Sequence, residues 1–413
     1  MREFWGELKS LALEPRFAKT ICKIALTFFV LTWVYFIFLD PYFFRHIDDM
    51  TQIINTTGIG KNIITIVRQS GRFWPLGLSY YNFLTTLPYG YTSQAHYMLN
   101  SLIFVVFILV LMKVIDFNWK QQPVHLYIKT FLIFCLPFIL GNRFYIFFNL
   151  IYAETFLCLL LAFFVLCYKK MMFLDELQVD KQAKDFSYGK EKCKFFKDNF
   201  RWLKDPFTLE QQKTCWAVLA ILVAIFATYC KETMFIVFLI IACINFLFAK
   251  KPLTKIDKIF NFALVVNVLC FLLIYYFTVV PYVSEKYASV DMTGHTLKFN
   301  SAIFGFISVP ILSLLGIFVI IRIFFVLFKK DKRYVFYDGL LFASFGYYIV
   351  VVSLGFHPDY YYIVPVIVLF FIVLAHWTIV FYDTKKYIVL SMIFIIIFLL
   401  GVEGGGGGDS FVK

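Results

Sequence analysis

The chain has 413 residues, of which 61% are hydrophobic, 21% are aromatic and only 16% are charged. A soluble domain is roughly half apolar and about a quarter charged, so a soluble globular protein is excluded and lipid is the expected solvent. The net charge of +13 does not indicate nucleic-acid binding, because the lysines stand in short runs between apolar segments, as topology signals do.

Apolar segments of about the 20 residues that a membrane span needs recur along the whole chain. They predict an all-α polytopic membrane protein with about 11 transmembrane helices, over residues 21–39, 97–115, 125–141, 148–168, 215–230, 233–249, 259–280, 302–328, 337–355, 361–382 and 387–402. The first segment is expected to be a retained span, because Asp40-Pro41-Tyr42 follows it in place of a small-residue cleavage site. The two segments beside Cys230 are short, so a broken or re-entrant pair is an alternative there.

Residues 1–402 are expected to form a single transmembrane domain, followed by a flexible glycine-rich tail at 403–413. The two longest connections are 40–96 and 169–214. Isoleucines at helical spacing in the first connection predict an amphipathic helix over 51–69. The second mixes basic and aromatic residues and is expected to be a solvated loop with a helix on the inner leaflet. The cysteines lie mostly in apolar segments without CxxC spacing, which indicates membrane-buried thiols and not a disulfide framework.

The basic residues predict the orientation of the chain, since cytoplasmic loops of membrane proteins carry an excess of Lys and Arg. With a cytoplasmic N-terminus, 29 of the 39 basic residues fall in cytoplasmic segments and nine fall outside. An odd number of spans then places the C-terminus on the outer side. The connection 40–96 becomes the first outer loop, and 169–214 becomes the main cytoplasmic loop.

In this orientation, the polar residues of five separate turns meet at the outer face. They are His46, Asp48, Asp49 and Arg72 in the first loop, Arg143 and Glu154, Lys231 and Glu232, His295 and Lys298, and His357 with Tyr361 and Tyr362. Ionisable groups at membrane depth are unfavourable and usually line a cavity or a pathway. A carboxylate beside an acceptor hydroxyl acts as a general base, and Arg, Lys, His and Tyr stabilise a phosphate leaving group. The pattern therefore indicates a reaction on a lipid-borne substrate at the outer interface.

The ordered set of these motifs resembles the GT-C superfamily of polytopic glycosyltransferases, which use polyprenyl-phosphate sugars. The resemblance covers nearly the whole chain, and the acidic pair followed by Gly-Arg is most similar to bacterial serotype-converting glucosyltransferases. The matching motifs are His46-Ile47-Asp48-Asp49, Gly71-Arg72-Phe73-Trp74-Pro75-Leu76, Tyr152-Ala153-Glu154-Thr155, Lys231-Glu232-Thr233 and His357-Pro358-Asp359-Tyr360-Tyr361-Tyr362.

This resemblance implies an inverting transfer of a hexosyl or pentosyl group from a polyprenyl-phosphate donor. The acceptor would be a cell-envelope glycan or glycolipid, such as the O-antigen of lipopolysaccharide, on the periplasmic face of a bacterial inner membrane. Asp48 would be the general base and Asp49 the second acid. Substrate binding would fall to Arg72, Arg143, Glu154, Lys231, Glu232, His357, Tyr361 and Tyr362, with the phosphate ligand among His357, Lys231, Arg143 and Arg72. Membrane lipid is an expected partner and nucleic acid is not.

Several of these residues also have simpler interpretations. Asp48 and Asp49 are alternatively caps of the amphipathic helix, or ligands, with His46, of a divalent cation such as Mg²⁺ or Mn²⁺. Lys231 and Glu232 are alternatively an ion pair that closes a tight turn, and the tyrosines an aromatic belt. For the whole chain, the alternatives are a transporter or flippase of lipid-linked glycans and a glycan polymerase or ligase.

Overall fold

The computed structural model describes residues 11, 14–38, 73, 75–77, 79–84, 87, 92–115, 123–148, 153–187, 208–249, 252–282, 303, 305–306, 309–329, 334–353, 361–386 and 388–389. All regular structure in these residues is helical, and they contain no strand. Nine of the described helices are long and apolar enough to cross a membrane. The chain is therefore a multi-pass helical membrane protein, because helices satisfy their own backbone hydrogen bonds in lipid.

The long helices follow the predicted segments in order. They are α2 (Pro15–Phe38), α5 (Ser93–Ile115), α6 (Pro123–Leu140), α7 (Ala153–Ser187), α9 (Leu209–Cys230), α10 (Phe235–Phe248), α11 (Lys255–Thr278), α14 (Pro310–Leu327), α15 (Val335–Ser353) and α16 (Val364–Asp383). Shorter elements are α4 (Ser79–Leu84) and the 3-10 helices η2 (Gly141–Phe147), η4 (Glu232–Met234), η5 (Val280–Tyr282) and η7 (Tyr361–Ile363). The predicted amphipathic helix at 51–69, the tail at 403–413 and nearly all of the segment 387–402 lie outside the described residues.

Helices α9 and α10 run in opposite directions; α9 is long and apolar enough to cross a membrane, and α10 with η4 forms a shorter apolar helix. Helix α9 begins at Leu209 with a capping box between Thr208 and Gln211, so it is a full span rather than the short segment expected from residue 215. Helix α10 is shorter, but Nζ of Lys213 donates a hydrogen bond to Oγ1 of Thr254 at 3.3 Å. The chain has therefore returned, after α10, to the end of the bundle where α9 begins.

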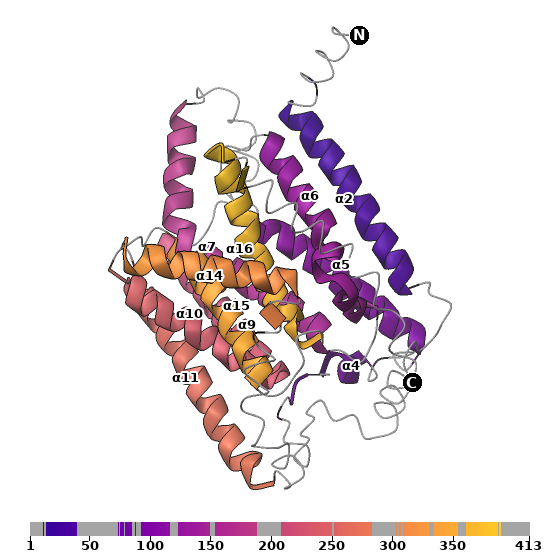
Figure 1. The fold of residues 1–413 in the computed structure, drawn as a ribbon, viewed down its shortest axis with the longest axis vertical. Coiled ribbons are helices and arrows are strands. Elements are labelled where there is room, and N and C mark those ends of the chain that lie inside the picture. The colour runs from indigo at the N-terminus through magenta and orange to yellow at the C-terminus, as the bar shows by residue number, and fades with distance from the viewer. Residues whose placement is uncertain are drawn as a thin grey trace.

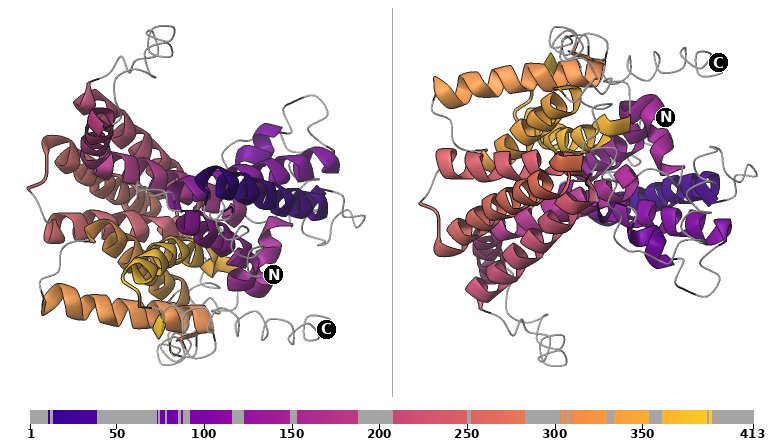
Figure 2. Two further views of the ribbon diagram at one scale, coloured as in Figure 1. Left: turned by 90° about the horizontal axis from the view of Figure 1, so that it is seen from above. Right: turned by 90° about the horizontal axis from the view of Figure 1, so that it is seen from below.

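Helix α16 lies in the middle of the bundle and packs against α5, α6, α7, α14 and α15. Figure 1 shows it in yellow, between α2 on one edge and α11 on the other. The views from above and below place α2, α5 and α6 on one side and α9 to α11 with α14 on the other (Figure 2). Side chains of the edge helices are exposed, such as Phe28 at 70% and Phe277 at 69%. Such surfaces suit lipid, whose tails are as apolar as these side chains.

Most described basic residues lie at one end of the bundle, called here the basic end, where α9 and α11 begin and where α14 and α16 end. They include Arg16, Lys19, Lys23, Lys113, Lys129, Lys169, Lys170, Lys213, Lys255, Lys258, Arg322, Lys329, Lys385 and Lys386. The opposite end carries Arg143 and Lys231 among the described residues. This asymmetry is the one that the sequence predicted for the two sides of a membrane.

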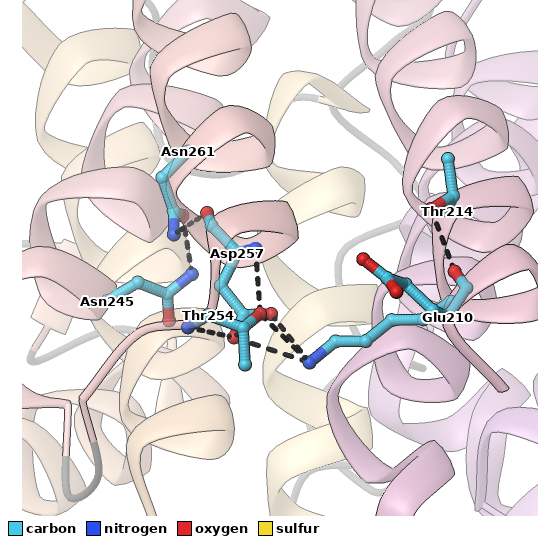
Figure 3. Close-up of polar contacts among 7 residues, drawn as sticks. Glu210, Thr214, Asn245, Thr254, Asp257 and Asn261 are labelled. Carbon is cyan, nitrogen blue, oxygen red and sulfur yellow. Dashed lines mark hydrogen bonds and ion pairs between the residues drawn. The ribbon is translucent and has the colours of Figure 1, made fainter.

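Buried polar side chains join four helices near the basic end. The Tyr168 hydroxyl of α7 donates to Oδ1 of Asn245 in α10 at 2.7 Å, and Nδ2 of Asn245 donates to Oδ1 of Asn261 in α11 at 2.8 Å. Asp257, one turn before Asn261, forms an ion pair with Lys213 of α9, with Nζ of Lys213 at 3.1 Å from Oδ1 of Asp257 (Figure 3). Polar groups within a membrane need partners of this kind, so the network fixes how these helices pack.

Candidate functional site

The end of the bundle opposite the basic end holds a buried ion pair. Glu154 lies in the first turn of α7, and Lys231 follows α9 in an extended conformation that separates α9 from η4. Nζ of Lys231 donates to Oε1 of Glu154 at 2.6 Å, and the two residues are 5% and 2% exposed. The structure thus joins two predicted site residues that are 77 positions apart. Lys231 pairs with Glu154 and not with its neighbour Glu232, so the alternative of a Lys231–Glu232 pair closing the turn is wrong.

The burial of this pair indicates a role for its charges. Removing one partner of a buried ion pair leaves the other charge uncompensated and costs about 3–5 kcal/mol. Replacing both partners by apolar side chains is often neutral or stabilising. A buried pair of this kind serves helix packing, as Lys213–Asp257 does, or interaction with a charged substrate, and the neighbouring groups decide between the two roles.

The ammonium group of Lys231 also faces an aromatic ring. Its Nζ lies 4.3 Å from the ring centroid of Tyr362 in η7, directly before α16. A cation within about 6 Å of a ring face is attracted by the negative face of the ring. An ammonium group has three N–H donors, and the described contacts of Lys231 engage one carboxylate and one ring face. A donor therefore remains for a further acceptor such as a phosphate oxygen.

The hydroxyl groups of Tyr80 and Tyr347 lie near this pair. Oγ1 of Thr233 donates to the hydroxyl of Tyr347 at 2.9 Å, and the ring of Tyr80 in α4 lies 4.7 Å from that of Phe156, two residues after Glu154. Burial raises the pKa of the Tyr80 hydroxyl well above its usual value, and Tyr81 and Glu154 act in the same direction. Tyr80 is therefore a protonated donor at neutral pH, since an unperturbed tyrosine already titrates near pH 10.

The returning end of the loop 40–96 is fixed beside Lys231. The backbone N–H of Leu76 donates to the carbonyl of Tyr229 at 3.0 Å, and the thiol of Cys230 donates to the carbonyl of Leu76 at 3.4 Å. Phe73 is 4% exposed and packs against the rings of Tyr229, Phe271 and Tyr275. These contacts tie the part of the chain that follows Asp48, Asp49 and Arg72 to the turn that carries Lys231.

His96 is a second buried polar side chain at this end. It lies in the first turn of α5 and is 1% exposed. Its ring lies 5.3 Å from that of Tyr81, which in turn lies 4.1 Å from the ring of Tyr80. His96, Tyr80, Tyr81, Thr233 and Tyr347 stand in none of the sequence motifs that predicted the site. The only sequence signal for His96 was a histidine at the start of an apolar segment.

The remaining predicted residues divide into two groups. Arg143 lies in η2, which is fastened at this end by hydrogen bonds from Asn100 and Thr155 to the carbonyls of Phe147 and Ile146. Glu232 lies in η4 beside Lys231, and Tyr361 opens η7 beside Tyr362. His46, Asp48, Asp49, Arg72, His295, Lys298 and His357 lie outside the described residues, so their predicted roles remain predictions.

A metal site has no support among the described side chains, because no three His, Cys, Asp or Glu residues there are grouped to hold an ion. The suggested ligands His46, Asp48 and Asp49 are outside the described part of the chain. The described cysteines are all free thiols, as predicted for these positions.

The fold and this site define a multi-pass α-helical membrane protein with a buried charged cluster at one end of its bundle. No family model, curated protein or solved structure matches the chain. The function must therefore be argued from the residues themselves.

Proposed function

We propose that this chain is an integral-membrane inverting glycosyltransferase. It moves a monosaccharide from a polyprenyl-phosphate carrier to a cell-envelope glycan or lipid acceptor at the periplasmic face of a bacterial inner membrane. The observation that carries the proposal is the buried Lys231–Glu154 pair, at the bundle end where Leu76 fixes the loop that bears Asp48 and Asp49. This arrangement supports a site in which loop carboxylates and a buried cation act on one substrate.

The charges of the pair suit a sugar phosphodiester. The phosphate between a polyprenyl chain and one sugar carries a single negative charge. Lys231, whose own charge Glu154 balances, offers this phosphate a spare N–H donor, and the further positive charge comes from Arg72, Arg143 or His357. The hydroxyls of Tyr80 and Tyr347 lie near Glu154 and stabilise charge that develops on the leaving phosphate. The exposed apolar side chains of the edge helices keep an isoprenoid tail in contact with the bundle.

The proposed reaction is a single displacement. The acceptor hydroxyl oxygen attacks the anomeric carbon of the donor sugar from the face opposite the phosphate. The bond between that carbon and the phosphate oxygen breaks, the electron pair leaves with polyprenyl phosphate, and the hydroxyl proton passes to Asp48. Asp49 orients Asp48, and Lys231 neutralises the leaving phosphate together with Arg72, Arg143 or His357. Attack from one face in one step inverts the anomeric configuration.

The proposed orientation rests on the distribution of basic residues. Placing the basic end in the cytoplasm puts the N-terminus inside and the Lys231–Glu154 pair outside, in agreement with the positive-inside rule. Polyprenyl-linked sugars and envelope glycans meet on that side.

The test is a transfer assay with purified protein in liposomes. The donors are polyprenyl-phosphate glucose, galactose, N-acetylglucosamine and arabinose, and the acceptor is envelope glycan from a strain that lacks the gene. We expect one of these sugars to be transferred, and Asp48→Asn to reduce the rate about 10²- to 10⁴-fold, the usual contribution of a general base. Mass spectrometry of the envelope glycans should show the same sugar missing from the deletion strain.

Two results would count against the proposal. Full activity of folded Asp48→Asn protein would remove Asp48 from the role of base. Movement of labelled lipid across the liposome membrane, without any new glycosidic bond, would favour a flippase.

A further inference from the structure

His96 has a defined protonation pattern in the structure. Its Nδ1 lies 2.9 Å from the backbone carbonyl oxygen of Thr92. A carbonyl oxygen only accepts hydrogen bonds, so Nδ1 carries the hydrogen. A neutral imidazole with its hydrogen on Nδ1 presents Nε2 as a hydrogen-bond acceptor.

Among the described residues, this acceptor has no hydrogen-bond partner, although Nε2 of His96 is buried. Buried polar atoms almost always have a partner, and the exceptions require an explanation. A group that binds during function is one such explanation, because an acceptor held ready in a buried position gains a partner only when its ligand arrives.

The position of His96 connects it to the Lys231–Glu154 pair. Its ring contacts Tyr81, Tyr81 contacts Tyr80, and Tyr80 stacks near Phe156 in the first turn of α7. Ala153, the residue before Glu154, packs in the same small cluster as Tyr81 and Tyr97. Tyr80 and Tyr81 thus place two phenol groups beside His96, and aromatic rings with polar groups suit a sugar with one apolar face and several hydroxyls.

We infer that Nε2 of His96 accepts a hydrogen bond from a sugar hydroxyl during the transfer. The inference rests on the proposed function and adds a sugar-binding residue to it. A hydroxyl fits because it has a hydrogen to donate, whereas the oxygens of an ionised phosphate have none. The hydroxyl belongs to the donor sugar or to the acceptor sugar. Separate measurements of donor affinity and of the KM for the acceptor distinguish these two sources.

Two substitutions isolate the Nε2 atom. In His96→Asn, the amide nitrogen takes about the place of Nδ1, so the bond to Thr92 remains and the Nε2 acceptor is lost. In His96→Gln, the amide oxygen reaches about as far as Nε2, so an acceptor remains. Thermal unfolding in detergent checks that both variants are folded.

The affinity measurements use Asp48→Asn protein without acceptor, so that the donor is not consumed during the measurement. The two probes are bare polyprenyl phosphate and the polyprenyl-phosphate sugar that the wild-type protein uses. We expect His96→Asn to weaken binding of the sugar-bearing lipid about threefold to tenfold, the range for one hydrogen bond, and to leave bare polyprenyl phosphate unaffected. His96→Gln should keep most of the affinity. An unchanged donor affinity with a raised KM for the envelope acceptor would assign the hydroxyl to the acceptor sugar.

The possible failures are distinguishable. One outcome is that the wild-type protein transfers sugar while His96→Asn changes neither the donor affinity nor the KM for the acceptor. That result would overturn the inference and leave the proposed function in place. An equal loss of affinity for both lipids would show that His96 is structural, which also overturns it. Absence of transfer by the wild-type protein from every donor would remove the proposed function, and this inference with it.

Discussion

At the scale of single residues, two buried lysines near opposite ends of α9 form ion pairs with different surroundings. Lys231 pairs with Glu154 at 2.6 Å, and Lys213 pairs with Asp257 at 3.1 Å. Lys213 is also hydrogen-bonded to Thr254, and Asp257 completes the capping box that starts α11. Lys213 therefore holds two helices together, whereas Lys231 has a spare donor. The two pairs lie roughly 27 Å apart, at 1.5 Å per helical residue.

We expect the double substitution Glu154→Met with Lys231→Met to give a folded but inactive protein. It removes both charges together, which is often neutral for stability. The single change Glu154→Met should lower the free energy of unfolding by about 3–5 kcal/mol, because it leaves the lysine buried and unpaired. Thermal unfolding in detergent and the liposome transfer assay measure the two effects.

The matched control is Lys213→Met with Asp257→Asn, at the basic end. Thr254 still caps α11, and the amide oxygen of the asparagine can accept the hydrogen bond from the Thr254 backbone N–H, so we expect transfer per folded molecule to stay at the wild-type level. Wild-type transfer by the double methionine variant would show that the Lys231–Glu154 pair is not part of the site.

At the scale of elements, the segment after the predicted catalytic acids is held by an aromatic cluster. Phe73 inserts between the rings of Tyr229, Phe271 and Tyr275. Leu76, three residues later, bonds to the backbone and thiol of the turn before Lys231. The loop and the buried cation are thus positioned by contacts that involve neither of the predicted acids.

We expect Phe73→Ala to release this segment and to reduce transfer while the helix bundle stays folded. Removing a buried phenylalanine costs about 3–5 kcal/mol, and the loss should be confined to the weakest local unit. Hydrogen–deuterium exchange should become faster around residues 73–84. The control is Phe277→Ala, at a lipid-facing side chain of α11 that is 69% exposed. It should change neither the transfer rate nor the hydrogen–deuterium exchange around residues 73–84. Unchanged exchange in the Phe73 variant would contradict this role.

The sequence predicted the boundaries of a helix only where the apolar run is as long as the helix itself. The expected segment at 215 missed the first turns of α9, because Glu210 and Lys213 lower the local hydropathy there. Lys213 is nevertheless 6% exposed, since Asp257 and Thr254 compensate its charge. Helix α7 likewise continues from Ala153 through the basic residues after 168 to Ser187. A charged turn can belong to such a helix when side chains from other helices pair with its charges, although the low hydropathy of that turn predicts that the helix ends before it.

At the scale of the whole molecule, the alternating directions of the helices and the basic end define two sides. Helices α9, α11 and α15 begin at the basic end, and α10, α14 and α16 finish there. The side of the membrane that each end faces follows from the positive-inside rule alone.

We expect cysteine labelling to place the loop 40–96 outside the cell. In a variant without native cysteines, Thr57→Cys should react with a membrane-impermeant maleimide in intact spheroplasts. Asp198→Cys, in the loop 169–214, should react only after permeabilisation. The reverse pattern would invert the topology and move the Lys231–Glu154 pair to the cytoplasmic side.

The sequence by itself determined the membrane class, the order of the long helices and the accumulation of basic residues at one end. These properties follow from local composition, since about 20 apolar residues must form a helix in lipid whatever their neighbours are. Only the tertiary structure decided that Lys231 meets Glu154 and not Glu232, and that His96 carries an unused acceptor behind Tyr81. Glu154 and Lys231 are 77 residues apart in the chain, so their pairing depends on how helices rotate and pack against each other, and no local pattern in the chain encodes that rotation.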